Sequence, residues 1–158
     1  MTLVIEKMNE KMAIEILNWT YEKPYDFYNN ELLESAIKEM LDGTYYAILG
    51  EFNELVGFFC MGENAKVPIG NQFGVYRDDF VDMGLGMNPN LVGQGKGYNF
   101  CSFIIKFIEE RFKATPTRLT VAKFNKRAIH LYEKLGFVME NEFSTVSSEF
   151  ITMVRKNN

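Results

Sequence analysis

Three glycines at alternate positions are the residues whose spacing most clearly suggests chemistry. Gly93, Gly95 and Gly97 lie within the stretch NPNLVGQGKGYNF at positions 88–100. A strand pattern precedes this stretch and a helical pattern follows it. A strand, a glycine loop and a helix N-terminus present several backbone N–H groups and the positive end of a helix dipole to one point. The sequence therefore predicts a phosphate-binding loop, with a tight turn that binds nothing as the alternative.

The spacing excludes the two commonest phosphate loops. A Walker A loop ends in Gly-Lys followed by Ser or Thr, whereas Lys96 is followed by Gly97, and Asn90 stands where its first glycine belongs. A dinucleotide fingerprint reads GxGxxG in a βαβ unit, whereas these glycines read GxGxG and follow an expected antiparallel hairpin. A nucleotide hydrolase is therefore disfavoured.

Cations at the start of two expected helices also point to an anionic ligand. Lys96 is expected in the first turn of one helix, and Lys126 and Arg127 follow the expected cap Asn125 of another. The helix dipole disfavours a cation there by roughly 0.3–1 kcal/mol unless an anion binds as well. A polyanionic ligand would explain both placements, although simple solvation of exposed cations is the other interpretation.

The elements that must position these residues alternate in type along the chain. Period-2 and period-3.6 patterns predict a strand, two helices, three strands, a helix, a strand, a helix and two strands. Asn9 is expected to cap the first helix, and the second is expected to begin after Asn29 and Asn30. The strands are expected at 3–8, 44–52, 54–62, 78–88, 118–124, 137–143 and 149–156. Residues 1–158 therefore form one expected α/β domain.

Composition limits the classes of function. Lys and Arg number 17 against 21 Asp and Glu, so the net charge of −4 argues against a nucleic-acid-binding protein. Cys60 and Cys101 lie in apolar surroundings without metal-ligand spacing, which predicts reduced core thiols and no metal site. The first 16 residues have no long apolar run, so no signal peptide and no membrane span is expected. A cytoplasmic location is expected.

Two linked segments resemble the signature regions of the GNAT superfamily of N-acetyltransferases. LGMNPNLVGQGKG ends at Gly97, and NKRAIHLYEKLGFV begins 28 residues later at Asn125. The resemblance implies a mixed, mostly antiparallel sheet of about seven strands with about four helices, and acetyl-CoA as co-substrate. The family's pyrophosphate loop usually begins with Gln or Arg, where this chain has Val92. Backbone N–H groups at Gly93, Gly95 and Gly97, with Gln94 and Lys96, are therefore expected to hold the coenzyme.

The resemblance also implies roles for residues beside the loop. Leu85, Gly86 and Met87 would pair with the pantetheine, with the Met87 N–H polarising the acetyl carbonyl. Asn125 would contact the coenzyme as well as cap its helix, and capping alone is the alternative. Tyr132, expected on the inward face of that helix, would protonate the leaving thiolate, and a plain core tyrosine is the alternative.

The general base and the acceptor site are less defined by the sequence. Asp82 is the favoured base, with Glu51, Glu63 and a water chain as alternatives. Tyr25, Glu22 and Asp26 lie in the segment 19–30, which the resemblance makes the acceptor loop. Its aromatic and acidic residues suit a cationic amine, whereas packing on the core is the alternative for most of the aromatics.

The expected function is acetyl transfer from acetyl-CoA to a primary amine by direct attack in a ternary complex. His130, the only histidine, is expected on the surface, which disfavours a Ser-His-Asp hydrolase. A non-catalytic acyl-CoA-binding sensor or scaffold is the alternative. Strand edges in the C-terminal half make a homodimer possible.

Overall fold

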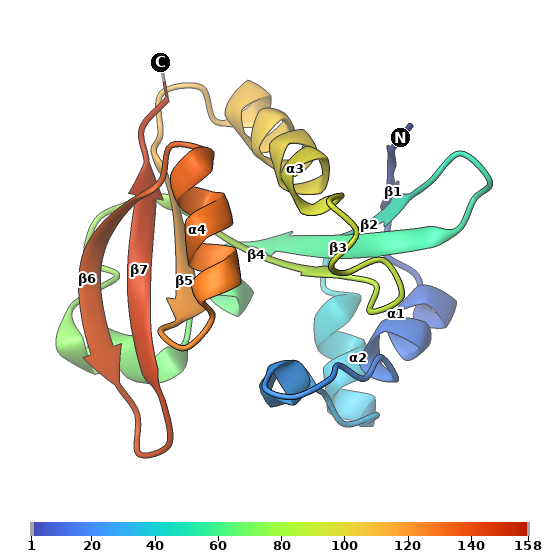
Figure 1. The fold of residues 1–158 in the computed structure, drawn as a ribbon, viewed down its shortest axis with the longest axis horizontal. Coiled ribbons are helices and arrows are strands. Elements are labelled where there is room, and N and C mark those ends of the chain that lie inside the picture. Colours follow the sequence, from blue (N-terminus) through green and yellow to red (C-terminus); the bar gives the residue numbers. More distant parts are fainter. Residues whose placement is uncertain (1, 158) are drawn as a thin grey trace. The chain divides into compact units, whose positions relative to one another are not determined.

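The computed structural model describes residues 2–157 and confirms the predicted order of strands and helices (Figure 1). Among these residues the strands are β1 (Val4–Lys7), β2 (Tyr45–Leu49), β3 (Leu55–Met61), β4 (Val81–Met87), β5 (Thr117–Ala122), β6 (Val138–Ser144) and β7 (Glu149–Arg155). The α-helices are α1 (Glu10–Leu17), α2 (Glu34–Met40), α3 (Gly97–Arg111) and α4 (Lys126–Lys134). Three short 3-10 helices, which the sequence patterns did not predict, are η1 (Tyr25–Tyr28), η2 (Glu63–Ala65) and η3 (Pro68–Phe73).

The seven strands form one sheet in the order β1-β2-β3-β4-β5-β7-β6. The pairs β1–β2, β2–β3, β5–β7 and β6–β7 are antiparallel, whereas β4 and β5 run parallel. The parallel register places Asp82 of β4 opposite Arg118 of β5. This mixed, mostly antiparallel sheet with four α-helices is the predicted fold class.

The chain divides into two compact units. The first unit comprises Met1–Cys60 and Leu85–Asn99, and the second comprises Met61–Gly84 and Phe100–Asn158. Strand β4 contributes its first half to the second unit and its last three residues to the first unit.

The first unit contains helices α1 and α2 and the β2–β3 hairpin. The Asn9 side chain accepts a 2.8 Å hydrogen bond from the Met12 N–H, which confirms the predicted cap. The prediction that the second helix begins after Asn29 and Asn30 is wrong, because α2 begins at Glu34. The Asn29 side chain accepts the Tyr21 N–H at 2.8 Å, so it closes a loop instead of capping a helix.

The second unit places α3 and α4 beside the C-terminal strands. In Figure 1, α4 lies along β5 and β7. The Asn125 side chain accepts the Ala128 N–H at 3.1 Å, and Gly136 ends the helix region with φ of 97°, as predicted. In the same unit, η3 lies near β6. A buried hydrophobic cluster in this part of the unit consists of Val75, Tyr76, Ala122, Phe143 and Phe150.

Both cysteines are free thiols in buried positions, which confirms the prediction of core thiols. Burial raises the pKa of Cys101 to about 12, so its nucleophilic thiolate form is scarce near neutral pH.

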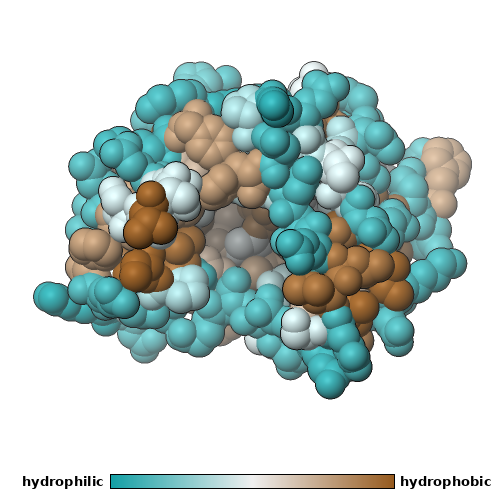
Figure 2. All heavy atoms as spheres, turned by 90° about the horizontal axis from the view of Figure 1, so that it is seen from below, coloured by the Kyte–Doolittle hydropathy of each residue, from teal (hydrophilic) through white to brown (hydrophobic). Residues whose placement is uncertain are grey.

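The exposed surface is mixed in character. Figure 2 shows hydrophobic side chains reaching one face in separate patches among hydrophilic ones. The exposed hydrophobic residues of the first unit include Phe27, Leu32, Leu33 and Leu41. Within residues 2–157, no helix is both long and apolar enough to cross a membrane.

Candidate active site

The glycine loop begins at Asn88, which fastens it to β3. The Asn88 backbone N–H donates to the Val56 carbonyl at 2.8 Å, and its side-chain amide donates to the Leu55 carbonyl at 3.0 Å. The Asn88 side-chain oxygen accepts the Asn90 N–H at 3.0 Å, and its carbonyl accepts the Leu91 N–H at 2.9 Å. These four hydrogen bonds fix where the loop leaves the sheet. This anchoring role was not predicted from the sequence, although an Asn directly after a strand and before Pro is a recognisable turn signal.

The loop itself presents open backbone to solvent. Gly93 and Gly95 have φ values of 79° and 74°, and a Cβ added at either would meet nothing within 4 Å. Positive φ favours glycine because L side chains clash with their own backbone there. An exposed run of backbone in this conformation fits an extended anion such as a pyrophosphate, whose oxygens accept backbone N–H groups.

The side chains of the loop depart in part from the expectation. Lys96 precedes α3, which begins at Gly97, so this cation does not lie in the first helical turn as predicted. The Gln94 side-chain amide donates to the Asn90 carbonyl at 2.8 Å, so one of its N–H groups closes the loop. Val92 is half-buried and has no polar side-chain atom. A coenzyme here would be held mainly by backbone N–H groups and Lys96.

Gly86 has a packing role that the sequence analysis did not anticipate. A Cβ at Gly86 would lie 2.3 Å from the Phe58 ring, so the ring occupies the space that a side chain would need. Phe58 in turn contacts the rings of Trp19 and Tyr45, with centroids 6.3 Å and 6.2 Å away. The absence of a side chain at Gly86 therefore leaves room for an aromatic cluster of the first unit. This packing role is independent of the predicted contact of Gly86 with the coenzyme.

Asp82 is not placed as a general base. Its carboxylate is 3% exposed, and its two oxygens accept hydrogen bonds from Nε and Nη2 of Arg118, both at 2.7 Å. A carboxylate that neutralises a buried guanidinium through both oxygens is not available to take a proton from an amine. The predicted role is therefore corrected to a structural one. The alternatives Glu51 and Glu63 are exposed, and Glu63 pairs with Lys66 at 2.6 Å.

Arg118 is the centre of a buried network in the second unit. Its guanidinium carbon lies 5.1 Å from the Tyr76 ring centroid and 5.3 Å from that of Phe80, and the group donates to the carbonyls of Val75 and Asp78. Burial lowers the pKa of the Arg118 guanidinium, but hydrogen bonds and charge from Asp82 outweigh this and raise it above its ordinary value. The sequence signal that could have indicated this ion pair is a charged residue of opposite sign in each of two apolar strand patterns: Asp82 in VDM and Arg118 in RLTVA.

Helix α4 and its cap contain the two other predicted residues of the second unit. Asn125 is buried and caps the helix. Tyr132 is 9% exposed, and its ring contacts Phe137 edge-on at 5.9 Å, so the tyrosine points inward as predicted. His130 is exposed, as predicted. The contacts of Asn125 and Tyr132 with a coenzyme stay predictions.

The predicted acceptor segment forms a closed loop in the first unit. Glu22 and Asp26 are exposed, and Tyr25 is half-buried at the start of η1. Tyr21, which the sequence analysis did not single out, donates its hydroxyl to the Met87 carbonyl at 2.7 Å. This contact joins the loop to the end of β4.

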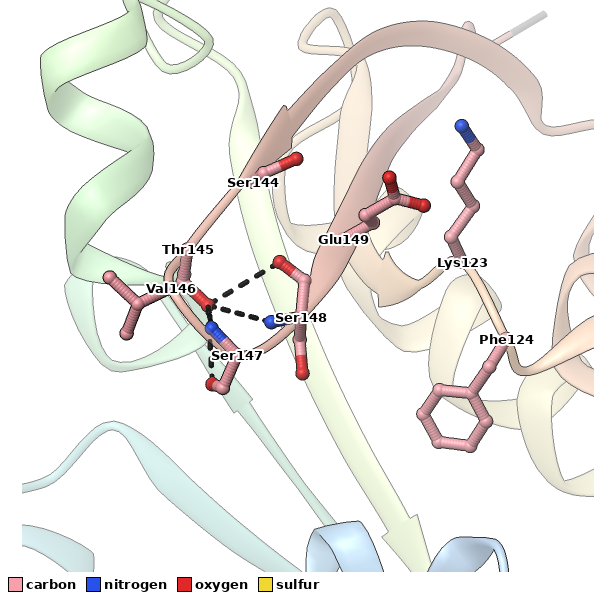
Figure 3. Close-up of a pocket in the computed structure, with 8 residues that line it drawn as sticks. All are labelled: Lys123, Phe124, Ser144, Thr145, Val146, Ser147, Ser148 and Glu149. Carbon is pink, nitrogen blue, oxygen red and sulfur yellow. Dashed lines mark hydrogen bonds between the residues drawn. The ribbon is translucent and has the colours of Figure 1, made fainter.

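A hollow of about 460 Å³ opens beside the start of α4 in the second unit (Figure 3). It is lined by Lys123, Phe124, Ser144, Thr145, Val146, Ser147, Ser148 and Glu149. The Thr145 hydroxyl accepts the backbone N–H groups of Ser147 and Ser148 at 3.3 Å and 3.1 Å, which shapes the β6–β7 turn. No residue predicted for the site lines this hollow.

The structure thus distributes the predicted residues over both units. The first unit brings together the glycine loop, the end of β4 at Leu85 to Met87, and the loop with Glu22, Tyr25 and Asp26. The second unit contains Asp82, Asn125 and Tyr132. The first unit thus offers an open backbone loop that suits an anion, and the second unit offers a buried tyrosine.

Residues 11–137 match the model of the acetyltransferase (GNAT) family. Because this match covers most of the chain, the chain belongs to that family and is an acyltransferase that transfers an acetyl group to an amine. Acetyl-CoA is the co-substrate of the family. No curated protein sequence matches the chain significantly.

Solved structures with the same fold match nearly the full length. A chimera of the spermidine N-acetyltransferase SpeG from Vibrio cholerae and hSSAT aligns with a TM-score of 0.71 at 18% identity, covering 98% of this chain and 95% of its own. A putative GNAT-family acetyltransferase from Bordetella pertussis aligns with a TM-score of 0.74 at 14% identity, covering 97% of this chain and 95% of its own. A GNAT-family acetyltransferase from Bacillus anthracis aligns with a TM-score of 0.72 at 14% identity, covering 98% of this chain and 94% of its own. At these identities the similarity is one of fold.

Proposed function

We propose that this acetyltransferase acts on the primary amine of a small cationic acceptor, by direct attack on bound acetyl-CoA in a ternary complex. The observation that carries the proposal is the open glycine loop at the start of α3. Its positive-φ glycines expose backbone toward solvent in a chain whose family uses acetyl-CoA.

The coenzyme is held by the loop backbone. The N–H groups of Gly93, Gly95 and Gly97 bind the pyrophosphate, and Lys96 supplies a positive charge beside it. Acetyl-CoA supplies an acetyl group activated as a thioester. Backbone at Leu85 to Met87 orients the thioester arm, and Asn88 fixes this backbone to β3.

Tyr132 protonates the thiol that leaves. Its ring is buried and contacts the Phe137 ring edge-on, so packing restricts the ring that carries the hydroxyl. The amine nitrogen bonds to the acetyl carbon and then releases its surplus proton to water. The carbon–sulfur bond breaks, and the sulfur receives the hydroxyl proton. Solvent then restores the proton of Tyr132.

Water takes the proton of the ammonium before attack. An alkylamine with a pKa near about 10 is mostly charged at neutral pH, and it must be neutral to attack. Because Arg118 engages both oxygens of Asp82, that carboxylate does not do this work. We expect kcat/KM for the amine to rise with pH toward the pKa of the amine.

A cationic acceptor fits the acidic loop of the first unit. Glu22 and Asp26 are both exposed in this loop, where they can pair with ammonium groups. Fold neighbours include spermidine N-acetyltransferase structures, whose acceptor carries several amines. We therefore expect a polyamine-like acceptor to be a better substrate than neutral amines and protein termini.

The test is release of thiol from acetyl-CoA in the presence of amines. Spermidine, a simple alkylamine, an amino acid and a peptide with a free N-terminus form the acceptor panel. We expect thiol release that requires an amine and is fastest with spermidine. Tyr132→Phe should lower kcat by about a hundredfold or more while acetyl-CoA affinity is retained.

Tyr46→Phe is the matched control. Tyr46 stacks on Phe59 with centroids 5.2 Å apart and belongs to no part of the proposed site. It should leave kcat unchanged. Binding of acetyl-CoA without thiol release with any amine would contradict the proposal and favour a coenzyme sensor.

A further inference from the structure

The peptide group between Met87 and Asn88 is held at both of its polar ends. Its carbonyl, on Met87, accepts the Tyr21 hydroxyl at 2.7 Å. Its N–H, on Asn88, donates to the Val56 carbonyl at 2.8 Å. Hydrogen bonds on both sides fix the plane of this peptide and thereby orient the backbone of Met87.

Tyr21 also closes the loop formed by residues 21–29. Its backbone N–H donates to the Asn29 side chain at 2.8 Å, and the Asn29 N–H returns to the Asp26 carbonyl at 3.0 Å. A further turn bond joins the Tyr25 N–H to the Glu22 carbonyl at 2.8 Å. One residue therefore both closes this loop and attaches it to the end of β4.

The chemistry of the Tyr21 hydroxyl suits a lasting donor. Burial raises its pKa to about 12, so it keeps its proton over the pH range in which most enzymes work. A carbonyl oxygen can only accept, so the bond to Met87 exists only while the hydroxyl is protonated. Tyr21→Phe removes this donor and keeps the ring.

We propose that Tyr21 is a positioning residue that couples the 21–29 loop to the end of β4. The loop carries Glu22 and Asp26, and the end of β4 leads into Asn88 and the glycine loop. The hydrogen bond between Tyr21 and Met87 holds acceptor-binding groups and coenzyme-binding backbone at a fixed separation within the first unit. The catalytic meaning of this coupling rests on the proposed function, whereas the coupling itself does not.

Hydrogen exchange followed by mass spectrometry tests the coupling without any substrate. We expect Tyr21→Phe to speed amide exchange in residues 21–29 by about 2–10-fold, because the hydrogen bond that attaches this loop to the end of β4 is lost. Exchange in residues 87–91 should rise with it. Unchanged exchange in either segment would overturn the inference.

Tyr28→Phe is the matched control within the same loop. The Tyr28 ring packs edge-on against Phe27 with centroids 5.2 Å apart. Like Tyr21→Phe, this substitution removes one hydroxyl group and keeps the ring. Exchange in residues 87–91 should match the wild type. An equal rise with Tyr28→Phe would mean that loop disturbance in general, and not the Tyr21 bond, affects the end of β4.

Kinetics separate this inference from the proposed function. With spermidine as acceptor, we expect Tyr21→Phe to raise the amine KM about 3–10-fold, with a smaller rise for a monoamine. The Kd of acetyl-CoA should stay within twofold. A spermidine KM equal to that of the wild type would overturn the catalytic part of the inference. Wild-type protein that releases no thiol with any amine would refute the proposed function, while hydrogen exchange would still decide the coupling.

Discussion

Replacing Asp82 by alanine tests the corrected role of this residue most sharply. The substitution removes both 2.7 Å hydrogen bonds to Arg118 and leaves a guanidinium that is 1% exposed. Among the described residues, the hydrogen-bond acceptors left to it are two carbonyls at 3.4 Å and 3.2 Å, beside two aromatic rings, and the charge of Glu140 also acts on it. Loss of one partner of a buried ion pair costs about 3–5 kcal/mol.

The assay is urea denaturation at pH 7.5 followed by circular dichroism. We expect the free energy of unfolding of Asp82→Ala to fall by about 3–5 kcal/mol. In a chain of this size such a loss lowers the thermal midpoint by about 6–20 °C. The double variant Asp82→Leu with Arg118→Met removes both charges, so it should recover most of this loss.

Two results would refute this reasoning. One is a loss below about 1 kcal/mol in Asp82→Ala, which would mean that Arg118 finds other partners or solvent. The other comes from Asp82→Asn, which keeps the shape but loses the charge. If Asp82→Asn abolished the pH dependence of kcat without lowering stability, Asp82 would be the general base after all.

Two further predictions concern packing and ionisation. Gly86→Ala should destabilise the protein by about 1–3 kcal/mol in urea denaturation, because its Cβ would lie 2.3 Å from the Phe58 ring; Phe58→Leu should relieve part of this cost, and additive losses would contradict the packing role. The free energy of unfolding should fall as pH rises from about 9 to about 12. In the unfolded chain Cys101 and Tyr21 ionise at their ordinary pKa values of 9.0 and 10.0, whereas in the folded chain both keep their protons until about pH 12. Cys101→Ala should make the lower part of this fall less steep, and an unchanged slope in that variant would contradict the prediction.

The fold could be predicted because its signals are local. Hydrophobic periodicity, the caps Asn9 and Asn125 and the positive-φ Gly136 each act within a few residues. The glycine loop could be predicted for the same reason, since its spacing and the following helix are contiguous in the chain. The start of α2 was misplaced because Asn29 bonds Tyr21 eight residues earlier, which no capping pattern reveals.

The parts of the site that could not be predicted depend on partners far apart in sequence. Asp82 and Arg118 are 36 residues apart and meet only through the parallel register of β4 and β5. Tyr21 and Met87 are 66 residues apart. A carboxylate in a strand near a ligand loop looks the same in the sequence whether it faces a substrate or a buried arginine. Only the tertiary pairing distinguishes the two.

Calorimetric titration with acetyl-CoA tests the central claim most directly. The protein should bind acetyl-CoA, and Gly95→Leu should weaken binding at least tenfold, because the side chain would enter the open space above the loop. Gly43→Leu is the control: Gly43 also has positive φ and open surroundings, but it lies in the turn between α2 and β2. It should bear a similar backbone strain of about 1–2 kcal/mol and keep wild-type affinity. Equal affinity of Gly95→Leu and wild type would show that the glycine loop does not hold the coenzyme.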